Sequence, residues 1–201
     1  VGLGKQTNED LLKLAIVHFL AGEFQHCRQA LDRYTPPDEN LPSRKKSLAN
    51  ETTILLWKIA TFVEAGQAEQ AVAYLRTHAP MGPSQALWQW TALARMFPPD
   101  QADLAISVSE ELLDQAIGRD RRQVEQLHIS LLSKAGRFEQ AHRKLIEWMS
   151  DPLATNRSFY GGLRLTTFIE EGRLDDAVAY VRSETRDVAD NSVRWSLALY
   201  L

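Results

Sequence analysis

The side chains of this sequence that most often carry chemistry are its histidines and its one cysteine. The histidines are His18, His26, His78, His128 and His142. None has a second histidine four residues away on a helix with a glutamate between them, which is the arrangement of zinc proteases. A single cysteine can form neither an internal disulfide nor a Cys-x-x-Cys metal site. The sequence therefore predicts no metal site, no cofactor and no enzyme.

Cys27 and His18 have a simpler interpretation than catalysis. A nucleophilic cysteine needs a base held beside it, and the sequence implies none for Cys27. Free cysteines often behave as small buried apolar side chains. We therefore expect Cys27 and His18 to be packing residues.

The overall composition excludes several classes of protein. With 201 residues, 44% of them hydrophobic, the chain can bury a substantial core. Its net charge of -3 provides no excess positive charge for a phosphate backbone, so the basic clusters Ser43–Ser47 and Gly118–Arg122 are expected to be solvated and no nucleic-acid partner is expected. No run approaches the roughly 18 to 20 apolar residues that span a membrane. We expect a soluble, cytoplasmic protein.

The elements that must position these residues are indicated by a recurring spacing. Glycine is followed by an apolar residue at the second place, a small one at the fifth and a larger apolar one at the ninth, as in Gly136, Phe138, Ala141 and Leu145. The turn positions of the five copies are Gly22, Gly66, Asp100, Gly136 and Gly172. The intervals between them are 44, 34, 36 and 36 residues. A period of this length is typical of a stacked supersecondary unit.

Each part of the spacing has a physical reason. Glycine takes the left-handed backbone conformation that ends one helix and lets the next one start, and Asp100 is expected to take it as well. The small residue allows two helices to approach closely, and the larger one lies one turn further on the same face. The small residues are Cys27, Ala71, Ala105, Ala141 and Ala177. The sequence therefore predicts that each copy packs its second helix through this face.

A second helix-length segment precedes each turn, with apolar residues spaced three and four apart. No useful length alternates with period two, so we predict an all-α fold. The predicted helical pairs are residues 8–36, 52–80, 86–117, 122–151 and 158–186 of a single domain, followed by a trailing helix at 190–201. Gly161-Gly162 is interpreted as a loosened helix start between two pairs.

A helical pair of about 34 residues with this glycine, aromatic and alanine spacing resembles the tetratricopeptide repeat. The resemblance covers most of the chain; pentatricopeptide and other helical-hairpin solenoids remain alternatives, because the first helices carry large residues such as Ile59 and Leu93 where the family has small ones. It implies an α-solenoid, a right-handed superhelix of about five antiparallel hairpins plus a C-terminal helix. Its concave face, formed mainly by the first helices, would hold a peptide or partner domain.

The same resemblance implies which residues face the partner. The positions ten and six before each turn are Leu12, Leu56, Trp90, Gln126 and Gly162, and Ile16, Ala60, Ala94, Ser130 and Thr166. The partner-binding candidates are Trp90, Gln123, Gln126, Ser130, Lys134, Thr166 and Glu170. The N-terminal half of this face would be apolar and the C-terminal half polar. Leu12, Leu56 and Trp90 have packing as an alternative, and Trp88 and Trp90 cannot both face one way.

The function expected is a non-catalytic scaffold for protein or peptide partners. One alternative is single-stranded RNA recognition, which the pentatricopeptide likeness implies. The other is a structural or assembly segment, in which Trp195 and Leu199 of the trailing helix form a self-association end of a homodimer. The apolar residues at the end of the sequence lead us to expect that the chain is part of a longer protein.

Overall fold

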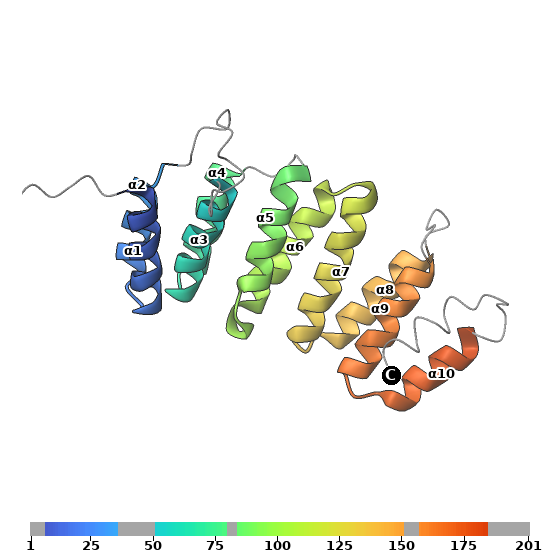
Figure 1. The fold of residues 1–201 in the computed structure, drawn as a ribbon. Helices are drawn as coiled ribbons and strands as arrows, with labels where there is room; N and C mark the ends of the chain where they lie inside the picture. Colours follow the sequence, from blue (N-terminus) through green and yellow to red (C-terminus); the bar gives the residue numbers. More distant parts are fainter. Residues whose placement is uncertain (1–6, 36–50, 80–83, 151–156, 185–201) are drawn as a thin grey trace, which may run out of the picture. The chain divides into compact units, whose positions relative to one another are not determined.

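The computed structural model describes residues 7–35, 51–79, 84–150 and 157–184. These residues form ten α-helices and one 3₁₀ turn and contain no strand, which confirms the all-α prediction for the described ranges. The elements are α1 (Asn8–Leu20), α2 (Phe24–Arg33), α3 (Glu51–Glu64), α4 (Ala68–His78), α5 (Ser84–Met96), η2 (Pro99–Gln101), α6 (Ala102–Gln115), α7 (Gly118–Lys134), α8 (Phe138–Ser150), α9 (Arg157–Glu170) and α10 (Leu174–Glu184) (Figure 1). The predicted trailing helix, with Trp195 and Leu199, lies outside the described residues.

The helices follow one another as five pairs, and the two helices of every pair pack against each other. Four pairs reverse at the predicted glycine, whose φ lies between 70° and 81° at Gly22, Gly66, Gly136 and Gly172. At each of these turns the glycine N–H bonds the carbonyl three residues back, and the next N–H bonds the carbonyl five residues back. These two bonds define the Schellman motif, which satisfies the last carbonyls of the first helix. The turn prediction is therefore confirmed at all four glycines.

The fifth turn differs from the prediction. No described residue other than glycine has a positive φ, so Asp100 does not take the left-handed conformation. Instead Pro98 and Pro99 end α5 early, because proline fixes φ and lacks an N–H, and η2 carries the chain into α6 with Gln101 N–H bonded to Pro98 O at 2.9 Å. As a result α5 ends four residues before position 100, whereas the other first helices end two residues before their glycine.

The predicted close-contact residues are buried in all five pairs. Their exposed fractions are 5% or less, at Cys27, Ala71, Ala105, Ala141 and Ala177. The larger partners Leu31, Leu75 and Leu145 are buried as well. Burial raises the pKa of the Cys27 thiol despite the opposing charge of Arg28, as expected for a packing residue.

The chain divides into two compact units, one containing α1–α6 (unit 1) and the other α7–α10 (unit 2). In unit 1, a core cluster joins α1, α2 and α3 around Ala15, Cys27 and Leu31. Arg28 of α2 donates to Thr61 O of α3 at 3.3 Å. Arg76 of α4 holds both carboxylate oxygens of Glu111 on α6, at 2.7 and 2.9 Å. Charged side chains thus connect successive pairs within the unit.

In unit 2, α9 packs against α7, α8 and α10. Gly161 lies inside α9 rather than at a helix start, which corrects the prediction for Gly161-Gly162. A Cβ at Gly161 would lie 3.1 Å from the Tyr180 hydroxyl of α10, so this glycine lets the two helices pack closely. His142 of α8 and Glu171 after α9 meet at 3.0 Å between Nε2 and Oε2.

None of the helices in the described ranges combines the length and apolar composition needed to cross a lipid bilayer.

Candidate functional site

The first helices of the pairs, α1, α3, α5, α7 and α9, carry an uncovered face. It consists of the last residue of each helix and the residues four and eight before it, a spacing that places the three on one side of a helix. We call this set the first-helix face. In unit 1 it comprises Leu12, Ile16, Leu20, Leu56, Ala60, Glu64, Trp88, Ala92 and Met96. In unit 2 it comprises Gln126, Ser130, Lys134, Gly162, Thr166 and Glu170. All of these residues are at least partly exposed.

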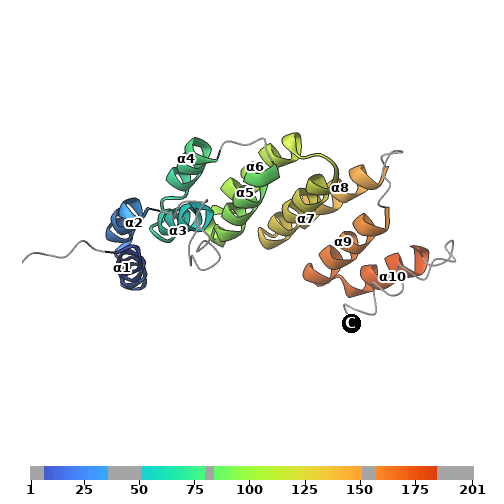
Figure 2. The ribbon, with the colours of Figure 1, turned by 45° about the horizontal axis from the view of Figure 1, so that its top comes forward.

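Unit 1 presents apolar side chains at eight of these nine positions. In Figures 1 and 2 the first helices of unit 1 follow one another in the order α1, α3, α5, and α3 packs against α5. Its most exposed large members are Leu20, Trp88 and Ile16. Exposed apolar surface that extends over several elements is typical of interaction sites.

The structure corrects the prediction for Trp90. Trp90 has no exposed surface, and its Nε1 donates to Ala79 O at 2.9 Å, so it packs α5 against the end of α4. Because α5 ends two residues early at the proline turn, counting from position 100 misplaces the face by two residues, or about 200° around the helix. The residue equivalent to Leu12 and Leu56 is Trp88, which is 49% exposed. This agrees with the expectation that one of the two tryptophans is partly exposed.

In unit 2 the predicted residues lie at the surface. Gln123, Gln126, Lys134 and Glu170 are exposed, and Ser130 is half-buried. Thr166 is also half-buried, and its hydroxyl donates to Gly162 O at 3.1 Å within α9. The members of the first-helix face in this unit are polar apart from a glycine.

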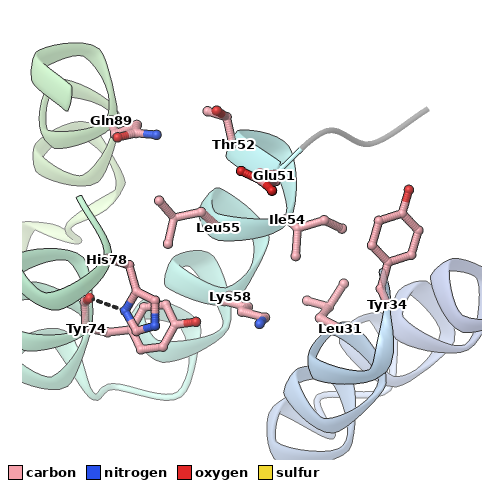
Figure 3. Close-up of a pocket in the computed structure, with 10 residues that line it drawn as sticks. All are labelled: Leu31, Tyr34, Glu51, Thr52, Ile54, Leu55, Lys58, Tyr74, His78 and Gln89. Atoms are coloured by element: carbon pink, nitrogen blue, oxygen red, sulfur yellow. Dashed lines mark hydrogen bonds between the residues drawn. The ribbon is translucent and has the colours of Figure 1, made fainter. Parts of the chain in front are cut away.

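A cavity of about 320 Å³ opens in unit 1 between α2, α3, α4 and α5. Figure 3 shows its lining residues. They are Leu31, Tyr34, Glu51, Thr52, Ile54, Leu55, Lys58, Tyr74, His78 and Gln89. The cavity borders the first-helix face at Thr52, which lies one helical turn before Leu56 on α3. The repeat spacing indicated part of the face, including Leu12, Ile16 and Leu56, whereas no motif indicates the cavity, because its lining comes from four helices.

Two of the residues that line the cavity are charged, Glu51 and Lys58. Lys58 Nζ contacts Asp32 Oδ1 at 2.6 Å, and only 16% of the Lys58 side chain is exposed. Burial lowers the pKa of Lys58, but its contacts with Asp32 and Tyr74 outweigh burial and leave the pKa above its ordinary value. Beside it the rings of Tyr74 and His78 stack at 4.0 Å. Because Asp32 already balances the lysine, the cavity suits an apolar or aromatic side chain better than an anion.

Unit 2 contains a buried polar cluster that the sequence did not indicate. Glu125 on α7 accepts a hydrogen bond from the Tyr160 hydroxyl of α9 at 2.8 Å and one from Arg121 Nε at 3.0 Å. Burial and the Glu125 contact raise the pKa of Tyr160 to about 12. His128, one turn along α7, is 1% exposed, and burial, together with the charge of Lys144, lowers its pKa to about 4.

This cluster is structural. Glu125 and His128 have almost no surface for a substrate, and Glu125 has donors from two side chains, so the carboxylate connects α7 to α9. Glu125 lies nine residues before the end of α7, and the residue at the same place in α1 is the buried Leu11. A charged residue at a position that is apolar in another copy was therefore the sequence signal for this cluster.

The histidines at the first turn come closer together than their spacing indicated. His18 is half-buried, and its Nδ1 lies 2.5 Å from Glu23 Oε2, so it is not the simple packing residue expected. His26, from the first turn of α2, approaches the same carboxylate. The two histidines lie on different helices and meet across the turn, so a spacing rule for one helix does not indicate them.

Comparison with protein-family models, curated proteins and solved structures gives no match for this chain.

Proposed function

We propose that this protein is a non-catalytic interaction module of the tetratricopeptide-like kind, in which the hairpins continue as a right-handed solenoid and the first-helix face binds a protein or peptide. The observation that carries the proposal is the first-helix face of unit 1, where eight of nine positions are apolar and none is buried. A monomeric protein seldom leaves so extended a set of apolar positions uncovered without a use for them. The four Schellman turns and the buried small residues support the repeat organisation.

Trp88 is the anchor of the proposed site. Tryptophan is enriched among the residues that dominate binding energy, and half of this side chain is exposed. Ile16 and Leu20 extend the same face on α1, and the cavity beside Thr52 offers a place for one apolar side chain of the partner. The partner of unit 1 is therefore a segment with apolar side chains at regular spacing.

The proposal is tested by selecting peptides from a random displayed library on the whole chain and measuring their affinity by fluorescence anisotropy. Trp88→Ala should weaken the selected peptides about tenfold or more. The matched control is Ile146→Ala on α8, since Ile146 is 47% exposed but lies outside the first-helix face. It should leave the affinity within about twofold. Peptides that bind both variants as tightly as the unaltered chain would refute the proposal.

The same material separates two competing functions. A single-stranded RNA reader should retain labelled oligouridine in a strongly salt-dependent way; the face opposes this, because its only charged members are Glu64, Lys134 and Glu170. An assembly segment should sediment as a dimer that Trp195→Glu dissociates.

A further inference from the structure

Three side chains that can bind a metal meet at the turn between α1 and α2. His18 comes from the last turn of α1, Glu23 is the N-cap residue of α2, and His26 lies in the first turn of α2. Glu23 Oε2 lies 2.5 Å from His18 Nδ1 and 3.7 Å from His26 Nδ1. One ligand atom from each residue lies within 4.8 Å of the other two. Two imidazoles and a carboxylate therefore converge on one point.

The backbone of the turn holds these residues in place. Gly22 has a φ of 73°, and the Glu23 N–H donates to His18 O at 2.8 Å. The Cys27 N–H then donates to Glu23 O at 3.0 Å and begins the hydrogen bonding of α2. A main-chain hydrogen bond thus joins Glu23 to His18. His26 follows on α2, whose N-cap residue is Glu23. The folded turn therefore fixes the backbone positions of the three residues relative to one another.

The turn at Gly172 brings the corresponding three positions together in the same way. The positions four before, one after and four after the glycine are Phe62, Gln67 and Gln70; Leu132, Arg137 and Gln140; and Phe168, Arg173 and Asp176. At the last of these turns Arg173 Nε donates to Asp176 Oδ2 at 2.6 Å, and the guanidinium carbon lies 5.2 Å from the centre of the Phe168 ring. The three positions meet there as well, but among the four glycine turns only the first has metal ligands at all of them.

We infer that the α1–α2 turn is a Zn²⁺ site formed by His18, Glu23 and His26. Imidazole and carboxylate are ligands of zinc, which binds nitrogen at about 2.0 Å. Two ligands of a tetrahedral zinc ion lie about 3.3 Å apart, so the distances from Glu23 Oε2 to His18 Nδ1 and to His26 Nδ1 need to change by less than about 1 Å.

The exposure of the three side chains defines the kind of site. The exposed fractions are 23% for His18, 51% for Glu23 and 63% for His26, so an ion reaches the site from solvent. Three protein ligands leave the fourth tetrahedral position for water or for a group of another molecule. The ion would join α1 to α2 and stabilise the first hairpin, since it binds the folded turn more tightly than the unfolded chain. This site is independent of the first-helix face and its proposed partner.

The test is calorimetric titration of the whole chain with ZnCl₂, compared among three variants. Glu23→Gln and His26→Gln place at the first turn the residue types that the second turn carries in the same positions, Gln67 and Gln70, so both are compatible with the turn. The matched control is His78→Gln, because His78 lies on α4 and its Nδ1 contacts Tyr74 O. Circular dichroism confirms that each variant is folded.

We expect one Zn²⁺ per chain with micromolar affinity, weakened at least tenfold by Glu23→Gln and by His26→Gln and unchanged by His78→Gln. Co²⁺ should give the visible absorption of a tetrahedral site with the unaltered chain and lose it with His26→Gln. Mg²⁺ should give no comparable binding, because it prefers oxygen ligands in an octahedral arrangement. The inference is overturned if the unaltered chain binds no stoichiometric zinc, or if binding survives both first-turn variants.

Discussion

The first-helix face is apolar in unit 1, at eight of nine positions, whereas in unit 2 the same positions carry Gln126, Ser130, Lys134, Thr166, Glu170 and a glycine. The buried side of the first helix is also more polar in unit 2 than in unit 1. Nine and six residues before its end, α1 places Leu11 and Leu14, while α7 places the buried Glu125 and His128. The four glycine turns and the buried small residue of each second helix are alike in both units, and only the proline turn before α6 departs from this pattern. The hairpin pattern therefore constrains those parts and leaves the first helix free to differ.

This comparison indicates that the first helices are the part in which the surfaces of the two units can differ. A uniform second helix maintains the packing of each pair, and the first helix supplies either an apolar surface or a polar one. In unit 2 the polar interior adds a hydrogen-bonded connection between α7 and α9 that unit 1 does not have at the corresponding α1 position.

The largest loss of stability is expected from a substitution that tests which of the two α5 tryptophans is in the interior. Trp90→Ala should lower the free energy of unfolding of unit 1 by about 3 to 5 kcal/mol, because it empties a fully buried site and leaves Ala79 O without its indole donor. Trp88→Ala is the matched control and should change it by less than about 0.5 kcal/mol. Hydrogen exchange of peptides from α5 and α6, followed by mass spectrometry, measures both. Equal losses in the two variants would contradict the assignment of Trp88 to the face.

Acid should destabilise unit 2 more than unit 1. The pKa of His128 is about 4 in the folded state, below its ordinary value of 6.5, so the unfolded state binds the proton more readily. The stability is therefore fully present above pH 6.5 and falls as the pH decreases towards 4, by on the order of 3 kcal/mol. In the described part of unit 1 no histidine is buried. Hydrogen exchange measured unit by unit between pH 7 and pH 4 reports the difference.

His128→Leu should remove most of this acid sensitivity, whereas the exposed His26→Gln should not. If both units lost stability in parallel on acidification, the contrast between their interiors would have no thermodynamic consequence.

The shared second helix should respond in the same way in both units. Ala71→Leu in α4 and Ala141→Leu in α8 each insert a larger side chain where the exposed fraction is 0%, and each should cost about 1 to 3 kcal/mol. Ala73→Leu, at an exposed position of α4, is the control. Urea denaturation followed by circular dichroism gives the free energies. A melting temperature unchanged by both buried substitutions would argue against the packing of the pairs.

The smallest effect is expected at the turns. Gly66→Ala and Gly136→Ala should each cost about 1 kcal/mol, because φ is near 70° at both positions while an added Cβ meets no atom within 4 Å. The cost therefore comes from the backbone alone and should be equal in the two units. Gly162→Ala, in the helical part of α9, is the control and should be neutral or stabilising. A difference between the first two variants larger than about 1 kcal/mol would show that the turns are not equivalent.

The parts of the fold that the sequence predicted depend on short separations along the chain. The glycine turns, the small residue five places later and the large one nine places later are all properties of one hairpin. Asp100 shows the limit of that approach, since the neighbouring Pro98 and Pro99 changed the turn and moved the end of α5. A shift of two residues was enough to exchange Trp88 and Trp90 between face and interior.

The remaining features depend on contacts that no local spacing contains. Glu125 and Tyr160 are 35 residues apart and meet only because α7 packs against α9. The cavity in unit 1 needs residues of four helices. The His18, Glu23 and His26 cluster has a short separation, but it crosses a turn, so helical periodicity alone does not bring the three together. Predicting these features would have required knowing how the helices of a unit are placed relative to one another.

The Schellman turns also have a kinetic consequence. Their hydrogen bonds join residues only three and five positions apart, so closing a hairpin costs little chain entropy. Structures dominated by such local contacts fold within microseconds to milliseconds. During synthesis the turn between α1 and α2 can therefore close early, whereas the core cluster around Ala15 and Cys27 is completed only when α3 has been translated.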